Sequence, residues 1–514
     1  MSFARCYFSI CPLQPTTRNS LLLFFAALLF HVAGTWIVPL IDRDEPRFAE
    51  ASREMMERAD YVVPYFNNAF RFDKPPLTYW AQTASYRIFG TNDFAARFPS
   101  CLAAALTALL LFAWGRRISG DRVGWWAAII FSLSLQTVEH AKAAVADMWL
   151  VLFVTLAHWA GYELLRDVLN VGEEKFSTLL RQGSGGEAPN EDHQSARWFW
   201  WWIFYLSLAL AFLAKGPIGW TPLLTIAATS IFVRGAGMAH RSAFVRGIIL
   251  VLALVCLWGV PALRETHGQF FRIGIGRHVL GRSVSAMGGH GAQSVGTYLL
   301  LIPFYFVTVF FSFFTWSIKL PWLTTRLREN RDRTDVYLLC GTAIVFGIFT
   351  LVTTRLLHYT LPAFPLLALL LARALAQSEV NHFVWRCARI AVPIYLALAL
   401  FVSPLLGKFF PARELFRQSR NDLQPDMEFG VVEFGEPSVV WYFRGRVNKF
   451  MTLLDRKNVD SFMAEEGPRF AILPTDAASR IFPSPPPEWK TFSTRGFNAV
   501  KGRRSDLTLI LKPE

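Results

Sequence analysis

Charged residues are scarce in this chain: Asp, Glu, Lys and Arg make up 18% of its 514 residues. A soluble globular protein usually contains about 25%. Hydrophobic residues make up 53%, and their excess falls in runs of about 20 residues, the length that crosses a bilayer as a helix. These properties exclude a disordered protein and an ordinary soluble enzyme, and they indicate a protein that crosses a membrane many times.

Cysteine motifs are also missing. No CxxC occurs, and the six cysteines lie in the N-terminal tail or within or beside apolar runs. This distribution argues against a disulfide framework and against a zinc–thiolate site. The chain shows no internal repeat at a fixed period, which argues against a solenoid and an obviously duplicated transporter.

Apolar runs of membrane-spanning length dominate the first four fifths of the chain. The first, 20–40, is too long for the apolar core of a signal peptide, so we expect an uncleaved span. A short helix over 77–90 adds to the count, and we predict about 11–13 transmembrane helices. The other runs lie at 97–114, 123–140, 147–165, 198–213, 217–233, 244–262, 297–318, 335–352, 357–376 and 388–407.

The basic residues predict the orientation. A net charge of +14 would suggest nucleic acid in a soluble protein, but here Lys and Arg gather in short loops between apolar runs, so we expect no nucleic-acid partner. By the positive-inside rule the N-terminus and the loop 166–197 are cytoplasmic. The loops 41–96 and 263–296 and the tail from 408 onward then lie outside. The cytoplasmic cations include Arg116, Arg117, Arg122, Arg234, Arg241, Arg246, Lys319, Arg326, Arg328, Arg331 and Arg333.

The tail has a different composition and predicts a small α/β domain, 408–514, after a membrane domain, 1–407. A helix is expected over 457–466, and the proline-rich segment 483–487 is typical of a loop. Short strands are expected at 430–434, 438–443, 469–473 and 507–511.

The first outer loop opens with three carboxylates, Asp42, Asp44 and Glu45, within four residues. They are followed by a predicted helix over 46–58, in which Glu50, Arg53, Glu54 and Glu57 are spaced to form helix ion pairs. Acids favour helix N-termini, so a solvated helix start is one interpretation. The other is that one acid faces the membrane and acts as a general base or nucleophile.

Charged residues recur at the outer ends of other spans. Asp73 and Lys74 precede Pro75 and Pro76, which hold the backbone extended. One interpretation is that this rigid pair holds a phosphate, a metal or a catalytic carboxylate. The other is that the charged side chains only snorkel to the membrane interface at the start of a helix. Further such residues are Lys142, Asp147, Lys215, Arg264, Arg272, Arg277, His278, Arg282, His290, Arg355, His358 and Tyr359.

Each of these groups alone is explained by interfacial anchoring of a helix end, but the predicted topology brings all of them to one face. Charges at membrane depth are costly, which makes a functional role the default hypothesis. Acids and cations gathered on one face suit a substrate with a phosphate and a lipid tail.

Four segments resemble the bacterial branch of the protein O-mannosyltransferase superfamily, which includes the lipid A 4-amino-4-deoxy-L-arabinose transferases. They are DRDEPRFAEASREM (42–55), FDKPPLTYW (72–80), DFAARFPSCLAA (93–104) and GRRISGDRVG (115–124). The resemblance continues more loosely through LAKGP (213–217), RHVLGR (277–282) and HYTLPAFPLLALLLA (358–372). It implies a GT-C fold and transfer of a sugar from a polyprenyl-phosphate carrier to an acceptor on the outer face of a bacterial cytoplasmic membrane.

The resemblance also implies roles for particular residues. The family's catalytic Asp falls on Asp44, and its second outer-loop acid falls on Asp147. The acid–Lys pair falls on Asp73 and Lys74. The lipid A enzymes bind a divalent metal ion through Glu at the acid position, where Asp73 is shorter, and His278 matches the loop histidine of that site. Expected substrate contacts, chiefly to phosphate, are Asp73, Lys74, Lys215, Arg282, Arg355 and Tyr359.

Three functions remain open at this point. The first is a transferase whose acceptor is lipid A, another envelope glycan or a protein hydroxyl. The second is a flippase or exporter of lipid-linked sugars, which would place its charges at mid-membrane depth. The third is a structural membrane subunit that presents its tail to partners. Neither of the last two explains DRDEP and DKPPL together.

Overall fold

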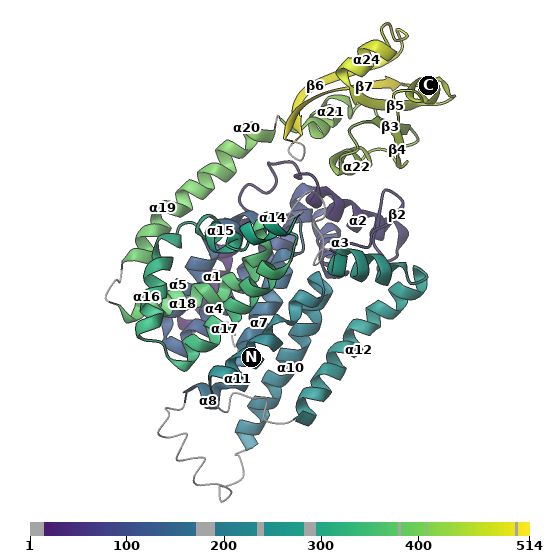
Figure 1. The fold of residues 1–514 in the computed structure, drawn as a ribbon. Helices are drawn as coiled ribbons and strands as arrows, with labels where there is room; N and C mark the ends of the chain where they lie inside the picture. Colours follow the sequence, from purple (N-terminus) through teal and green to yellow (C-terminus); the bar gives the residue numbers. More distant parts are fainter. Residues whose placement is uncertain are drawn as a thin grey trace, which may run out of the picture.

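The computed structural model describes residues 15–170, 191–233, 241–281, 294–378, 382–407, 409–498 and 502–514. Figure 1 shows a body of long helices and, beyond one end of it, a small domain built on a sheet. This confirms the predicted fold class, a mostly helical membrane protein with a small α/β domain at its C-terminus.

The first part of the body contains the predicted outer loop and the helices around it. The helix expected over 46–58 is confirmed as α2, and the short one over 77–90 as α3. The elements are α1 (Pro15–Val32), α2 (Asp44–Arg58), β1 (Tyr65–Phe66), β2 (Ala69–Phe70), α3 (Leu77–Phe89), α4 (Asp93–Ser119), α5 (Asp121–Ser132), α6 (Leu135–Ala141), α7 (Asp147–Leu164) and α8 (Arg166–Asn170).

The second part of the body runs from 191 to 407. Its elements are α10 (Glu191–Lys215), η1 (Pro217–Trp220), α11 (Thr221–Phe232), α12 (Arg241–Glu265), η2 (Phe270–Gly281), α14 (Val295–Leu300), α15 (Phe304–Ser312), η3 (Ser317–Lys319), α16 (Leu320–Glu329), α17 (Arg333–Leu351), η4 (Leu357–Ala363), α18 (Phe364–Gln377), α19 (Phe383–Ala397), η5 (Leu398–Val402) and α20 (Ser403–Gly407).

Six of the described helices are long and apolar enough to cross a membrane, and two more apolar helices are shorter. The chain is therefore an integral membrane protein, and the count of about 11–13 spans stays a prediction. Two predicted runs are interrupted. The run 123–140 divides into α5 and α6 at Ser134, whose backbone is extended. The run 297–318 divides at Pro303, because proline has no N–H to continue a helix.

Burial separates the helices of the core from those that face outward. The central helices α4 and α18 are mostly buried, whereas α12 and α19 leave large apolar side chains exposed, such as Leu257 (75%) and Ile390 (64%). Exposed apolar faces on membrane-spanning helices are the surfaces that contact lipid. The outward helices therefore mark the lipid boundary of the body.

The C-terminal domain begins after α20, where the predicted boundary at 407/408 lies. Its sheet has the order β4-β3-β5-β7-β6, in which β3 is parallel to β4 and β5, and β7 is antiparallel to β5 and β6. The elements are α21 (Pro411–Ser419), β3 (Glu428–Val432), α22 (Pro437–Phe443), β4 (Met451–Leu454), α23 (Val459–Ala464), β5 (Arg469–Pro474), α24 (Thr475–Ile481), β6 (Lys490–Asn498) and β7 (Arg503–Lys512).

The strand predicted at 438–443 is wrong, because this segment is the helix α22. All seven of its residues are buried, so its apolar run carries no alternation that distinguishes a strand from a helix. Pro437 occupies the first helical turn, where its fixed φ favours helix entry. The strands expected at 430–434, 469–473 and 507–511 correspond to β3, β5 and β7.

Ion pairs join α2 of the outer loop to α22 of the C-terminal domain. Arg444 pairs with Glu50, whose side chain is fully buried, and its Nη2 lies 2.7 Å from Glu57 Oε2. Arg53 pairs with Glu50, as the helix spacing predicts, and donates to the carbonyl oxygen of Trp441 at 3.1 Å. Burial raises the pKa of Glu50 to about 7, against the opposing effect of the two arginines.

Candidate functional site

The three acids that open the outer loop have different surroundings. Glu45 is buried and pairs with Arg97 at 2.7 Å (Nη2–Oε2). Asp42 accepts hydrogen bonds from the backbone N–H and the hydroxyl of Ser438, at 2.8 and 2.6 Å. Asp44 is exposed and makes no hydrogen bond or ion pair with any residue that the structure describes. The fold therefore uses Asp42 and Glu45, and it leaves the Asp44 carboxylate available.

Asp73 and Lys74 lie just before α3, where the two prolines bring the chain into the helix. Asp73 Oδ2 lies 3.3 Å from Arg71 Nη2, and Arg71 Nε donates to the hydroxyl of Tyr79 at 2.9 Å. The carboxylates of Asp44 and Asp73 both act electrostatically on Arg71. The structure thus brings the two predicted acids of the outer loop to the same cation.

Asp147 and Lys215 form an ion pair between two helix ends. Asp147 is the first residue of α7 and Lys215 the last of α10, and Lys215 Nζ lies 2.5 Å from Asp147 Oδ1. The turn after Lys215 depends on Gly216, whose φ of 83° favours glycine. Lys215 Nζ also lies 5.7 Å from the ring centroid of Tyr359. Three sequence-predicted site residues therefore meet here.

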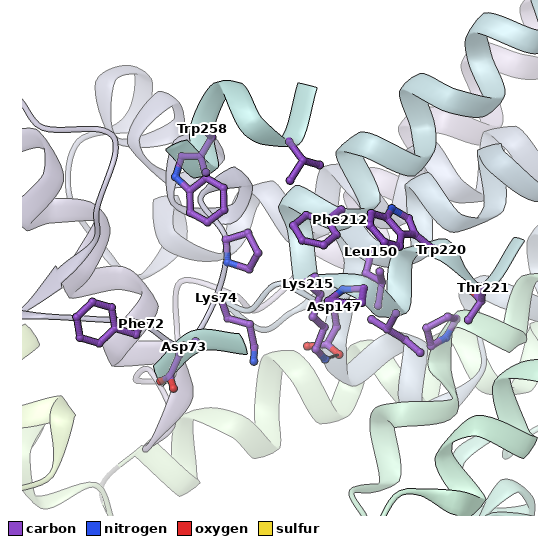
Figure 2. Close-up of a pocket in the computed structure, with 18 of the residues that line it drawn as sticks. Phe72, Asp73, Lys74, Asp147, Leu150, Phe212, Lys215, Trp220, Thr221 and Trp258 are labelled. Carbon is purple, nitrogen blue, oxygen red and sulfur yellow. Dashed lines mark hydrogen bonds and ion pairs between the residues drawn. The ribbon is translucent and has the colours of Figure 1, made fainter. Parts of the chain in front are cut away.

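A cavity of about 680 Å³ connects the Asp73–Lys74 segment with the Asp147–Lys215 ion pair. Figure 2 shows the charged ends of Asp73, Lys74, Asp147 and Lys215 along one side of it, with aromatic side chains on the other. Its apolar wall comes from α10, η1, α11, α12, η2 and α17, and includes Phe212, Trp220 and Trp258. The cavity therefore combines a long apolar surface with one strongly charged end.

The structure does not place the remaining predicted site residues in the cavity. Arg355 does not line the cavity; it is 5% exposed and donates to the carbonyl oxygen of Thr350 at 3.1 Å. Its guanidinium lies 5.2 Å from the ring centroid of Tyr298, and its Nε and Nη1 have no hydrogen-bond partner among the described residues. Arg282 lies outside the described residues. His278 lies in η2, and its side chain is outside the described part.

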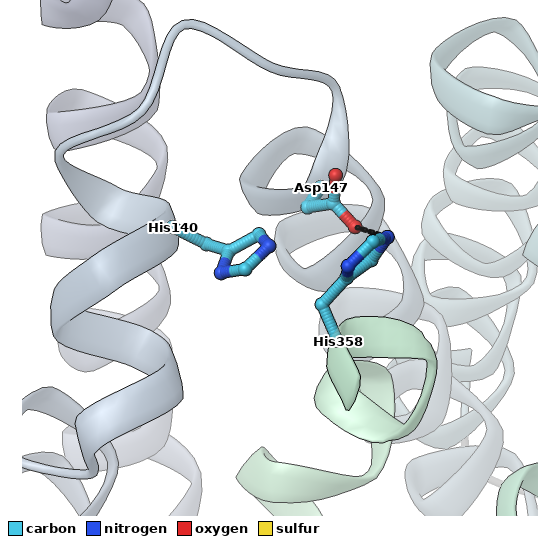
Figure 3. A group of neighbouring side chains, drawn as sticks. All are labelled: His140, Asp147 and His358. Carbon is cyan, nitrogen blue, oxygen red and sulfur yellow. Dashed lines mark ion pairs between the residues drawn. The ribbon is translucent and has the colours of Figure 1, made fainter. Parts of the chain in front are cut away.

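His140 is a member of the site that the sequence analysis missed. Figure 3 shows His140 from α6, Asp147 from α7 and His358 from η4 facing one another. The imidazole rings of the two histidines have centroids 4.9 Å apart, and His358 Nε2 lies 3.9 Å from Asp147 Oδ1. The only sequence signal for His140 was its position seven residues before Asp147, at the same outer end of a span.

His140, Asp147 and His358 each offer a ligand atom, these atoms lie within 4.8 Å of one another, and the group could hold a metal ion. The cations next to the carboxylates disfavour such an ion. Arg71 lies beside Asp73 and Lys215 beside Asp147, so each carboxylate already has a cationic neighbour. A divalent ion bound at either acid would be repelled by that neighbour. The arrangement is better suited to an anionic ligand, for which Lys74 and Lys215 supply positive charge beside an apolar wall.

Comparison with known proteins places the chain in a class. The family model "Dolichyl-phosphate-mannose-protein mannosyltransferase" matches residues 73–170. A crystal structure of ArnT from Cupriavidus metallidurans bound to undecaprenyl phosphate has a TM-score of 0.76 at 16% identity, covering 96% of this chain and 98% of that one. The chain therefore has the fold of GT-C membrane proteins.

Proteins with similar sequences include a glycosyltransferase. The undecaprenyl phosphate-alpha-4-amino-4-deoxy-L-arabinose arabinosyl transferase of Edwardsiella ictaluri is 29% identical over 368 residues, 68% of this chain and 58% of that protein. An uncharacterised protein of Aquifex aeolicus is 22% identical over 71% of this chain and 67% of its own length. The chain is therefore similar to GT-C glycosyltransferases in sequence and has their fold, as the sequence resemblance implied. It aligns with less than two thirds of the length of the Edwardsiella transferase.

Proposed function

We propose that the chain is a membrane glycosyltransferase that moves a sugar from a polyprenyl-phosphate carrier to an envelope acceptor: lipid A, another glycan or a protein. The observation that carries this proposal is the cavity of about 680 Å³, whose apolar wall ends at Lys74 and Lys215. An isoprenoid chain needs such a wall and its phosphate needs such cations. The carrier phosphate is the leaving group, so the reaction needs no nucleotide.

The proposed reaction is a single displacement at the anomeric carbon. Asp44, whose carboxylate makes no hydrogen bond or ion pair with a described residue, accepts the proton of the attacking hydroxyl or amine. The bond from the anomeric carbon to the acceptor forms as the bond to the carrier phosphate breaks, which inverts the anomeric centre. The phosphate leaves with the electron pair, and Lys74 and Lys215 stabilise its growing charge.

The other site residues assist in this scheme. Asp147, which the resemblance gives as a second catalytic acid, holds Lys215 at the charged end of the cavity. Tyr359 lines the cavity beside Lys215, and Asp73 lies beside Lys74 in the sequence. Arg282 is proposed as a further cation for the phosphate, whereas Arg355 does not line the cavity and would act on the phosphate only from outside it. The predicted divalent metal, with Asp73 and His278 as ligands, takes no part in these steps and is tested by elemental analysis of the purified protein.

The flippase alternative lacks a specific observation in its favour. The Edwardsiella relative is named a transferase, and a carrier that only moves its cargo has no use for an available carboxylate such as Asp44. The proposal places the enzyme in the bacterial cytoplasmic membrane, with the N-terminus inside and the C-terminal domain outside. The acceptor then meets the donor on the outer face.

Donor affinity tests the proposal. Replacing Lys74 or Lys215 with Ala removes a charge-assisted hydrogen bond worth roughly 1.5–3 kcal/mol, which weakens binding by roughly ten- to a hundredfold. The measurement is binding of a polyprenyl-phosphate-linked sugar to the full-length protein in nanodiscs. Arg328→Ala, on the exposed surface of α16, is the control and should be neutral. Equal loss in the control and in Lys74→Ala would overturn the phosphate site.

A further inference from the structure

A second cavity, of about 1200 Å³, lies between the helical body and the C-terminal domain. Its walls include Trp36 after α1, Asn92 at the start of α4, Gly407 at the end of α20, and Trp441 in α22. The helix α21 forms a further wall. Figure 1 shows α21 directly beyond α20, where the chain leaves the helical body for the sheet domain.

The helix α21 presents a row of cations to this cavity. Arg413, Arg417 and Arg420 all line it, and their spacing of four and three residues places them on one face of a helix. The opposite face is buried through Ala412 and Leu415. The helix is therefore amphipathic, with its cationic face on the cavity and its apolar face in the domain core.

Much of this positive charge is available to a ligand. Arg417 pairs with Glu414 at 2.6 Å, and Arg413 Nη1 donates to the carbonyl oxygen of Ile37 at 2.8 Å. Arg420 is exposed, and its side chain makes no hydrogen bond or ion pair within the part of the chain that the structure describes. Three arginines face one glutamate along this wall, which leaves a net positive charge.

The other acid on the cavity wall, Asp93, is already engaged. It accepts hydrogen bonds from Trp441 Nε1 at 2.8 Å and from the hydroxyl of Tyr442 at 2.9 Å. Its carboxylate therefore holds α22 against the start of α4 and does not face the arginines as a partner in an ion pair. An anion is the ligand that this cavity is built to accept.

Apolar side chains next to the cavity indicate where the rest of the ligand lies. Phe401, Leu405 and Phe409 are 72%, 61% and 57% exposed on the segment that leads from α19 to α21. Trp36 is 52% exposed on the cavity wall, and exposed tryptophan is typical of the membrane–water interface. The arginine face therefore meets an apolar surface at the level where lipid headgroups lie.

We propose that this cavity binds the phosphate headgroup of a membrane lipid, in the leaflet that faces the C-terminal domain. The headgroup lies on the Arg413, Arg417 and Arg420 face, and the acyl chains lie along η5 and α20. An amphipathic cationic helix at an interface binds anionic lipids through this combination of forces. The site is separate from the cavity of about 680 Å³ and does not depend on the proposed transferase activity.

Native mass spectrometry of the full-length protein in detergent tests this site, with dioleoyl phosphatidylglycerol as the titrated probe. We expect Arg420→Gln to weaken binding about tenfold, and Arg417→Gln/Arg420→Gln to weaken it further. The single variant removes a side chain without partners among the described residues, so its folding should be unchanged. The matched control is Arg456→Gln/Arg480→Gln, on the far side of the sheet domain, where Arg456 is ion-paired and Arg480 exposed.

Three results would overturn the proposal. The first is wild-type affinity for phosphatidylglycerol in Arg417→Gln/Arg420→Gln. The second is an equal loss in the control pair. The third is full displacement of the lipid by an equal concentration of soluble glycerol phosphate, which would show that the cavity takes a free phosphate and that the apolar surface adds nothing. Phosphatidylcholine, which has no net charge, should bind at least tenfold more weakly than phosphatidylglycerol.

Discussion

Asp42, Asp44 and Glu45 are close in sequence, yet the fold separates their roles. Glu45 neutralises the buried Arg97, and Asp42 binds Ser438 of the C-terminal domain. Only the Asp44 carboxylate, among these three, has no partner in the described residues. A general base needs an available carboxylate that can reach the acceptor, so the contacts of the neighbouring acids favour Asp44.

Asp44→Asn should therefore abolish sugar transfer while the protein folds and inserts normally. Loss of a general base typically costs roughly 10²–10⁴-fold in rate. Asp42→Asn should lower the rate much less, since the Asp42 carboxylate is already held by two hydrogen bonds from Ser438. The measurement is transfer from a polyprenyl-phosphate-linked sugar to an acceptor by each purified variant. Activity retained in Asp44→Asn, or equal loss in both variants, would contradict the general-base role.

Asp42 also predicts a pH dependence of stability. Burial raises its pKa in the folded protein to about 6 from an ordinary value of 3.8. Between about pH 4 and pH 6 the folded state therefore binds more protons than the unfolded state, and this group's contribution to stability falls as the pH rises. Apparent melting temperatures in detergent at pH 4.5 and 7 measure it. Asp42→Asn should remove the part of the melting temperature that Asp42 adds at pH 4.5 relative to pH 7. A pH dependence of the melting temperature that is the same in Asp42→Asn and in the wild type would contradict the prediction.

The sequence predicted that certain charged residues lie on one face of the membrane, but it did not predict which of them contact one another. The expectation that Asp73, Lys74, Asp147, Lys215 and Tyr359 share one face is consistent with the cavity that they line. The pairing of Lys215 with Asp147 joins residues 68 positions apart, and neither local spacing nor hydropathy carries information at that separation. Tertiary packing alone also brings His140 to His358.

At the scale of elements, α2 and α22 form the main polar contact between the outer loop and the C-terminal domain. Both Glu50 and Glu54 have fully buried side chains that face Arg444. A buried carboxylate without a cation is costly, whereas one held by arginine is tolerated. The helix that begins with Asp44 is therefore held in place by a residue of the C-terminal domain.

Arg444→Ala should destabilise the protein by roughly 3–5 kcal/mol, because it leaves two buried carboxylates without this partner. The measurement is the apparent melting temperature in detergent, together with protease sensitivity of the outer loop. Arg446→Ala is the matched control: it lies two residues further on, is exposed, and should change stability by about 0.5 kcal/mol or less. Identical melting of the two variants would show that the ion-pair network does not hold α2.

Element prediction failed at one fully buried apolar run and at two apolar runs that the fold interrupts. The run 438–443 has the composition of a strand but forms α22, since its packing against α2 and its proline start decide the conformation. The predicted spans 123–140 and 297–318 are each interrupted, because hydropathy detects apolar length but not a local break in helical hydrogen bonding. Long uninterrupted runs such as the one that forms α4 were predicted well.

At the scale of the molecule, the fold brings the outer loop and several helix ends together around the charged end of the cavity. The cavity of about 680 Å³ takes its charged residues from segments between 73 and 358. Such a site requires all of these helix ends to be on the same side of the membrane. If the predicted topology is wrong, the site cannot lie on the outer face, so an experiment that tests the topology also tests the site.

Reporter fusions at positions 190 and 470 should give opposite signals, cytoplasmic at 190 and external at 470. The physical reason is the excess of Lys and Arg in the loops assigned to the cytoplasm. The measurement is alkaline phosphatase and fluorescent-protein activity of each fusion in cells, since phosphatase is active only outside and the fluorescent protein only inside. A fusion at 234–240, a second loop predicted to be internal, serves as the control. A cytoplasmic signal at 470 would place the α2–α22 contact, and with it Asp44, on the inner face, where an outward-facing transfer reaction cannot occur.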